Sequence, residues 1–194
     1  MKATGKKDFE ILSFKTAKAF EKWLAKNHAM TDGIWIKFFK KDSGEKTLTY
    51  KEALDEALCY GWIDGQANKY DDASWIQKFT PRRTRSIWSK RNTEYIERLT
   101  KLGKIKQAGL AEVERAKADG RWEKAYDKPS DMTIPGDFLK KLSKDKKAKS
   151  FFESLNKTNK YAITWRLQTA KKPETREKRM NLILEMLSKG EKFH

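Results

Sequence analysis

The feature that most constrains the fold is a pair of alternating segments separated by a short polar turn. The first segment, WIDGQANKY, begins at Trp62; the second, SWIQKFT, ends just before Pro81; and DDA lies between them. Alternation of apolar and polar residues with aromatic enrichment is typical of half-buried strands. Proline cannot donate to the hydrogen-bond ladder of a sheet. The stretch therefore predicts a β-hairpin that ends at Pro81.

Strands and capped helices are also predicted before the hairpin. Residues 9–14 alternate, and residues 33–39 (GIWIKFF) are apolar on both faces, which is typical of a central strand. Thr16 precedes a helical apolar stripe, and Thr49 with Glu52 has the T-x-x-E pattern of a capping box. We therefore expect an α+β fold, with helices packed on a small antiparallel sheet.

Helical spacing follows the hairpin. We expect a helix capped by Ser89 or Asn92, a second helix stopped by Gly120, and a further helical turn that carries Trp122 and Tyr126.

A linker-like stretch with two prolines and a glycine spans residues 127–137, and only helical stripes come after it. Pro173 suits the first turn of the last helix. We predict two domains: an α+β domain over 1–127 with the WIDG and FTPRR motifs, and a helical C-terminal subdomain over 131–194.

The charge balance points to anionic partners. The 194 residues include 44 Lys and Arg against 27 Asp and Glu, a formal charge of +17. Such a chain attracts nucleic acid, anionic membrane surfaces or phosphorylated and carboxylated small molecules, unless the lysines only solvate the surface. The single cysteine excludes an intramolecular disulfide. No export signal or membrane-spanning run is evident, so we expect a cytoplasmic location without membrane insertion.

Metal, nucleophile and cofactor chemistry are poorly supported. The two histidines, His28 and His194, stand apart from other ligand types, and no glycine-rich phosphate loop is present. Cys59 lies near the apolar face of a predicted helix, where a buried, inert thiol is expected. We therefore expect no metal and no cofactor.

The hairpin and the arginine run after it form the candidate ligand site. Alternation places Trp62, Asp64 and Gln66 on one strand face. Guanidinium groups pair bidentately with phosphate or carboxylate, and neutral side chains near a helix start add donors. The candidate ligand-binding residues are Trp62, Asp64, Gln66, Arg82, Arg83, Ser86, Trp88, Ser89 and Asn92.

Two other interpretations of these residues remain open. Arg82 or Arg83 could simply form ion pairs with Asp64, Asp71 or Asp72 across the hairpin. In an enzyme, Asp64 or Ser86 would take part in catalysis, which for Asp64 requires burial to raise its pKa.

A second basic cluster surrounds Pro173. Lys171, Lys172, Arg176 and Arg179 could contact a phosphate backbone, with Trp165 as a stacking platform. The alternative is a solvated helix face, in which Glu174 and Lys178 form an i,i+4 pair.

Four motifs, EALCYGWIDG, FTPRRTRSIWSKRN, IPGDFLKKL and AKKPETREKRM, resemble the bacteriocin-protection, YdeI/OmpD-associated family over nearly the whole chain. The resemblance implies a bacterial origin and an association with stress and with resistance to antimicrobial peptides. It also implies an outer-membrane porin as partner for some members. It transfers no catalytic residue to this chain.

The expected function is that of a non-enzymatic binding protein for an anionic small molecule or a protein partner. The alternatives are nucleic-acid binding through the basic C-terminal helices, and an enzyme that acts on an anionic substrate. Because a strongly basic chain repels cationic peptides, any protection against them should be indirect.

Overall fold

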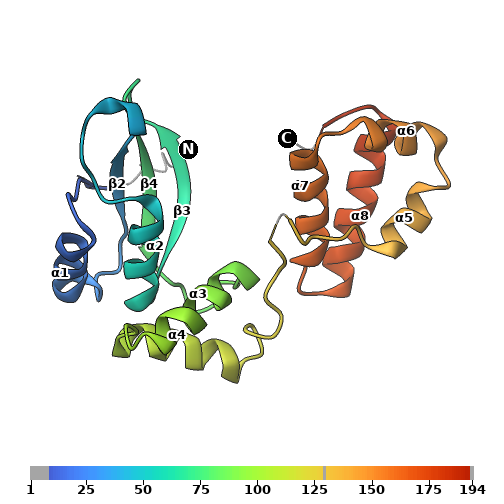
Figure 1. The fold of residues 1–194 in the computed structure, drawn as a ribbon. Coiled ribbons are helices and arrows are strands. Elements are labelled where there is room, and N and C mark those ends of the chain that lie inside the picture. The colour runs from blue at the N-terminus through green and yellow to red at the C-terminus, as the bar shows by residue number, and fades with distance from the viewer. Residues whose placement is uncertain (1–8, 129, 193–194) are drawn as a thin grey trace, which may run out of the picture. The chain divides into compact units, whose positions relative to one another are not determined.

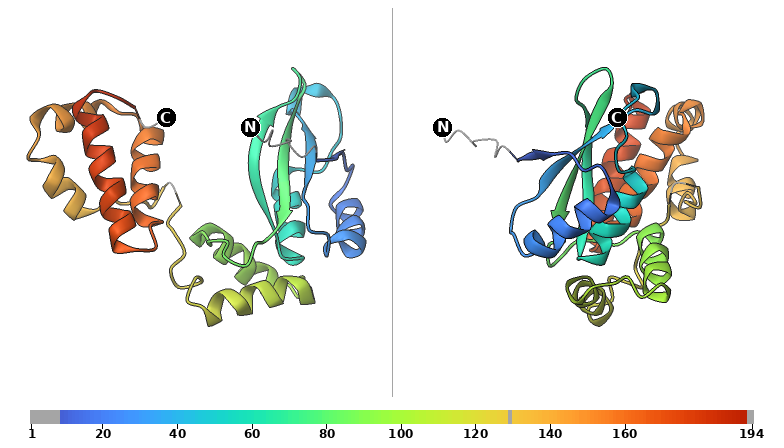
Figure 2. Two further views of the ribbon diagram at one scale, coloured as in Figure 1. Left: turned by 180° about the vertical axis from the view of Figure 1, so that it is seen from behind. Right: turned by 60° about the vertical axis from the view of Figure 1, so that its left-hand side comes forward.

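The computed structural model describes residues 9–128 and 130–192, which divide into two compact units. The first unit contains the described residues up to Trp88 together with Asn92–Lys124. The second contains Ser89–Arg91 together with the described residues from Ala125 onwards. Figures 1 and 2 show a sheet with helices in the first unit and helices in the second. The predicted α+β fold with a helical C-terminal part is confirmed.

The sheet of the first unit has the strand order β1-β2-β4-β3. The strands are β1 (Ile11–Leu12), β2 (Ile34–Phe39), β3 (Trp62–Lys69) and β4 (Ser74–Pro81). The β2–β4 and β3–β4 pairs are antiparallel, whereas β1 pairs with β2 in parallel and makes the sheet mixed. The predicted hairpin and its end at Pro81 are confirmed, and β2 is an inner strand as expected. The strand expected over residues 9–14 is only two residues long.

The first two helices of the first unit begin at the predicted caps, Thr16 and Thr49. The helices of this unit are α1 (Ala17–Asn27), α2 (Tyr50–Cys59), α3 (Lys90–Lys101, whose first two residues belong to the second unit) and α4 (Gln107–Ala118), with a 3-10 turn, η1, at Lys41–Ser43. The hydroxyl of Thr16 accepts from the Ala19 N–H at 3.2 Å. Thr49 and Glu52 form the predicted capping box, in which each side chain accepts from the other residue's N–H.

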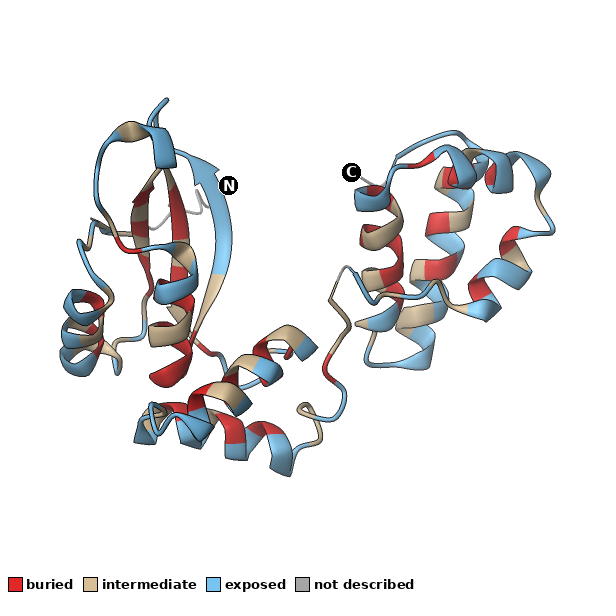
Figure 3. Cartoon of the chain, viewed as in Figure 1, coloured by how far each residue is buried: buried red, intermediate tan, exposed pale blue. Residues whose placement is uncertain are grey.

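Aromatic side chains from the sheet and α1 form the core of the first unit. Phe20, Trp62 and Phe79 have no exposed surface, and the buried positions line the inner faces of the elements in Figure 3. The Phe20 and Phe79 rings lie 6.0 Å apart, and Trp23 meets Trp62 edge-on at 5.7 Å. Both contacts have the spacing that aromatic pairs prefer.

A glycine allows α4 to approach the end of α2. A Cβ atom added to Gly109 would lie 2.3 Å from the Cys59 carbonyl oxygen, closer than any real side chain. The same carbonyl accepts from the Lys106 N–H at 3.0 Å. This close packing positions α4 and the turn that follows it.

Two local predictions are corrected. The helix α3 starts at Lys90, so Ser89 precedes it and the alternative that Asn92 caps it is wrong. Trp122 lies in a turn, and Tyr126 forms an isolated bridge with Ser89, so neither is helical. Gly120 adopts a φ of 71° and ends the helical region, after which the Trp122 N–H returns to the Ala116 carbonyl.

The second unit consists of helices around its own apolar core. They are α5 (Gly136–Leu142), α6 (Lys146–Ser154), α7 (Lys157–Gln168) and α8 (Pro173–Ser188). Pro173 occupies the first turn of α8, as predicted. Asp145 and Asn156 cap α6 and α7 through their side-chain oxygens. The fully buried ring of Phe138 packs edge-on against Phe152 at 5.6 Å.

Candidate functional site

The start of β3 is part of the core and not a ligand surface. The Trp62 ring is fully buried, and its Nε1–H donates to the His28 carbonyl oxygen at 2.9 Å. The half-buried Asp64 accepts a 2.6 Å hydrogen bond from the Tyr50 hydroxyl. Both side chains therefore link β3 to neighbouring helical segments.

Gln66 lies within a β-bulge that follows Asp64 in β3. The register pairs Asp64 with Phe79 but Ala67 with Gln77, so β3 contains one extra residue between the two pairs. Such an insertion reverses the alternation of faces beyond it. The expectation that Gln66 shares the face of Trp62 and Asp64 is wrong. Its side chain is exposed and donates to Asn68 instead.

The aspartates of the hairpin have partners other than the arginine run. Asp71 pairs with Lys37 at 3.3 Å, and Asp72 pairs with Lys69 at 2.5 Å. Asp64 accepts from Tyr50, as described above. The alternative in which Arg82 or Arg83 forms ion pairs with these aspartates therefore does not account for the arginine run.

Arg82 is buried against an aromatic ring at the end of β4. It is only 6% exposed, and its guanidinium carbon lies 3.4 Å from the centroid of the Trp88 ring. Its Nη1 donates to the Ile87 carbonyl oxygen at 3.3 Å. Its main-chain N–H donates to the Gly61 carbonyl oxygen at 3.0 Å. A desolvated guanidinium over an indole face is an attractive cation–π arrangement.

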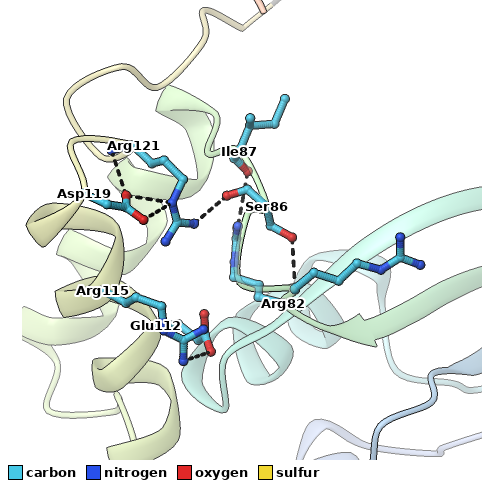
Figure 4. A network of polar contacts seen from close by, with 8 residues as sticks. Arg82, Ser86, Ile87, Glu112, Arg115, Asp119 and Arg121 are labelled. Carbon is cyan, nitrogen blue, oxygen red and sulfur yellow. Dashed lines mark hydrogen bonds and ion pairs between the residues drawn. The ribbon is translucent and has the colours of Figure 1, made fainter. Parts of the chain in front are cut away.

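A second arginine reaches the same loop from the turn after α4. Figure 4 shows Arg121 and Arg82 approaching the segment of Ser86 and Ile87. Arg121 Nη1 donates to the Ser86 carbonyl oxygen at 2.7 Å, and its Nε lies 2.7 Å from each carboxylate oxygen of Asp119. We call Arg82, Ser86, Ile87, Trp88, Asp119 and Arg121 the arginine–tryptophan cluster.

Sequence reasoning missed Arg121. It lies 35 residues after Ser86, beyond two helices, and no local pattern joins them. The only available signal was the adjacent Trp122, whose ring packs against Trp88 at 5.0 Å.

The cluster holds more donors than acceptors. Trp88 is 2% exposed, and the Arg121 side chain is 11% exposed. Within residues 9–128 and 130–192, Trp88 Nε1 and Arg121 Nη2 are buried and have no hydrogen-bond acceptor. Indole and guanidinium nitrogens can only donate, so the site suits a group rich in acceptor oxygens.

The other predicted ligand residues serve the local fold. The Ser86 hydroxyl accepts from the Arg83 N–H at 3.1 Å, while the Arg83 side chain is exposed. Ser89 belongs to the second unit through its bridge with Tyr126, and Asn92 lies within α3. Of the nine candidates, the structure brings Arg82, Ser86 and Trp88 together.

Thiol and metal chemistry find no support among the described residues. Cys59 is buried, as predicted, and burial raises the pKa of its thiol to about 12. At neutral pH this thiol is therefore protonated and weakly nucleophilic. The described part of the chain contains no group of three histidine, cysteine or acidic side chains that could hold a metal ion.

The second unit joins the IPGD and PETR motifs through one ion pair. Arg176 donates to both carboxylate oxygens of Asp137, at 2.5 and 2.9 Å. Hydrogen bonding from Arg176 holds the pKa of Asp137 below its usual value. A pocket of about 370 Å³ lies beside this pair, with Asp127 and Gln168 among its lining. The pair fixes the start of α5 to the first turns of α8.

The remaining residues of the predicted polyanion site are also placed by the structure. Arg179 donates to the Arg166 carbonyl oxygen at 2.8 Å, and Trp165 packs edge-on against Tyr126 at 6.0 Å. Lys171 and Lys172 are exposed. Of the five residues, Arg176, Arg179 and Trp165 thus make contacts inside the second unit.

The comparisons with known proteins divide the chain at a similar place. Residues 12–112, more than half of the chain, match the family described as Domain of unknown function (DUF8412), and the chain belongs to that family. Residues 131–190 match the family described as Bacteriocin-protection, YdeI or OmpD-Associated, which confirms the predicted resemblance. The searches of curated proteins and of solved structures gave no match. Arg82 lies inside the first matched stretch, and Arg121 lies between the two.

The described helices include none that is both long enough and apolar enough to cross a membrane.

Proposed function

We propose that the first unit binds a small anion, a carboxylate or phosphate group, at the arginine–tryptophan cluster. The supporting observation is that Trp88 Nε1 and Arg121 Nη2 are buried donors without an acceptor among the described residues, beside the buried guanidinium of Arg82. Leaving one buried donor unsatisfied costs about 1–3 kcal/mol. An oxyanion would supply both acceptor atoms and opposite charge.

The burial of the cluster favours a small ligand over a polymer. Arg82 and Trp88 are almost fully enclosed, and a nucleic-acid backbone needs exposed contacts along its length. Arg83 and Arg85 are exposed in the same loop and would raise the local concentration of anions. The binding of an anion does not require the chain to act as an enzyme.

The link to bacteriocin protection comes from the family of the second unit. With a formal charge of +17, the chain would repel cationic peptides, so direct capture of such peptides is unfavourable. We propose that protection is indirect and depends on the bound anion, and that the chain works in the cytoplasm, where a lone buried cysteine stays reduced.

The test is a calorimetric and thermal-shift titration of the full chain with inorganic phosphate, acetate and citrate, at an ionic strength held constant with sodium chloride. One anion should bind saturably and raise the melting temperature, as a ligand specific for the folded state must. Arg121→Lys keeps the positive charge but removes the planar guanidinium that can donate two parallel hydrogen bonds, and it should weaken anion binding about ten-fold.

Arg115→Lys is the matched control, because the Arg115 side chain is 41% exposed and pairs with Glu112 at 2.8 Å, outside the cluster. It should leave the affinity unchanged. If no anion differs from sodium chloride, or if both variants lose the same affinity, the proposal is wrong. Binding of RNA and duplex DNA alone, with a steep dependence on salt, would transfer the function to the exposed basic surface.

A further inference from the structure

A separate pocket of the first unit lies between α3 and α4 and includes Trp122 in its wall. Its volume is about 340 Å³. Pockets for small molecules span about 300–1,000 Å³, so this one suits a ligand at the small end of the range. It shares no residue with the arginine–tryptophan cluster.

The walls of this pocket are mainly apolar. Ile96 from α3 and Val113 from α4 are 3% and 5% exposed and form its buried part. Leu110 adds apolar surface and is 40% exposed. Covering this surface with an apolar group would be favourable by about 25 cal/mol for each Å² removed from water.

The charged side chains of the pocket leave a net positive rim. They are Glu97 and Lys101 on α3 and Lys117 on α4. The ammonium of Lys117 lies 5.4 Å from the centroid of the Trp122 ring. Neither lysine forms an ion pair with any carboxylate of the described residues. Each of the two helices thus presents a lysine without a carboxylate partner among the described residues beside one apolar pocket.

We propose that this pocket binds a small amphiphilic carboxylate, with its apolar body between α3 and α4 and its carboxylate toward Lys101 and Lys117. The apolar walls favour the apolar part of the ligand, and the two lysines favour a negatively charged head group over a positive one. This inference goes beyond the proposed function, because it assigns a second site with a different ligand class.

Trp122 lies between the two sites and allows binding to be observed. One aromatic contact joins it to Trp88, which stacks on Arg82, and Lys117 approaches the same Trp122 ring. A ligand in the pocket should therefore change Trp122 fluorescence, and Trp122→Phe should remove that change. Calorimetry gives the affinity independently of the seven tryptophans of the chain.

The experiment compares decanoate with decyltrimethylammonium, below their micelle concentrations, on the full chain. The two probes have the same apolar body and opposite charges. Decanoate should bind with one-to-one stoichiometry, and the cationic probe should bind at least several-fold more weakly. The double variant Lys101→Gln/Lys117→Gln should lower the affinity for decanoate about five-fold. Leu110→Glu should also lower this affinity, because it places a negative charge in the wall of the pocket.

The double variant Lys18→Gln/Lys22→Gln is the matched control, because it removes the same two positive charges from exposed lysines of a different helix, α1. It should not change the affinity for decanoate. Equal binding of both probes, insensitivity to Leu110→Glu, or no binding of decanoate would each overturn the proposal.

A further variant separates this proposal from the proposed function. Arg121→Lys should leave decanoate binding intact while it weakens the small-anion site. If decanoate binding is lost in Arg121→Lys but kept in Lys101→Gln/Lys117→Gln, the separate pocket is refuted and the arginine–tryptophan cluster is the only site involved.

Discussion

Arg82 and Arg176 both belong to arginine-containing motifs, yet the two units use them differently. In the first unit, Arg82 is 6% exposed, stacks on Trp88 and donates to a main-chain carbonyl. In the second unit, the Arg176 side chain is 31% exposed and forms a bidentate pair with Asp137. In the first unit the guanidinium is buried away from water, whereas in the second its charge is balanced by a carboxylate at the surface.

The difference shows that arginine content alone does not locate an anion site. A surface pair such as Arg176–Asp137 is worth little, since water solvates both charges even when they are apart. A buried guanidinium depends on its surroundings for every contact, and further buried donors next to it create a demand for an acceptor. The candidate site is therefore in the first unit, although both units contain basic clusters.

The largest expected effect comes from breaking the Arg82 arrangement. Arg82→Ala should lower the free energy of unfolding of the first unit by about 3 kcal/mol, because it uncovers the Trp88 face and leaves a void. Arg176→Ala should cost the second unit less than about 1 kcal/mol. Hydrogen exchange read by mass spectrometry separates the two units. The exposed neighbour variant Arg83→Ala should stay within about 0.5 kcal/mol of the parent; equal losses in Arg82→Ala and Arg83→Ala would contradict the comparison.

A medium effect should distinguish two buried tryptophans of the first unit. Trp62→Phe removes an indole N–H that donates to His28, whereas Trp88→Phe removes one with no acceptor among the described residues. Trp62→Phe should therefore be the more destabilising by about 1 kcal/mol in urea unfolding. Only Trp88→Phe should weaken anion binding. Equal stability losses together with unchanged anion affinity in Trp88→Phe would refute the proposed donor role of Trp88.

The smallest effect is the pH dependence of the Arg176–Asp137 pair. Because Arg176 lowers the pKa of Asp137 in the folded state, the pair stabilises the second unit above the unfolded pKa of about 3.9. This stabilisation is lost as the pH falls through the folded pKa. Asp137→Asn should be slightly less stable than the parent at pH 7, by less than about 1 kcal/mol. The urea midpoints of the two proteins should converge as the pH falls below the lowered pKa of Asp137. A gap that stays constant over the whole acidic range would show that charge is not the cause.

Local elements were largely predictable from the sequence. The hairpin ending at Pro81, the Thr49–Glu52 capping box and the placement of Pro173 all depend on neighbours a few residues away, and each is found in the structure. The bulge in β3 was not predictable, because an inserted residue leaves the composition of the strand unchanged while it moves Gln66 off the predicted face. The turn at Trp122 was missed because Gly120 ends the helical region and no new helix begins.

The candidate site was only half predictable for the same reason. The sequence by itself determined that Arg82 and Trp88 lie in one short segment after the hairpin, because proline and strand alternation locate that segment. Its motifs also indicated the resemblance to the family whose model matches residues 131–190. Only the tertiary structure decided that Arg121 joins Arg82 from 39 positions away, that Trp62 belongs to the core and that Arg176 is compensated by Asp137. These outcomes depend on which distant groups packing brings within hydrogen-bond distance, and no local propensity carries that information.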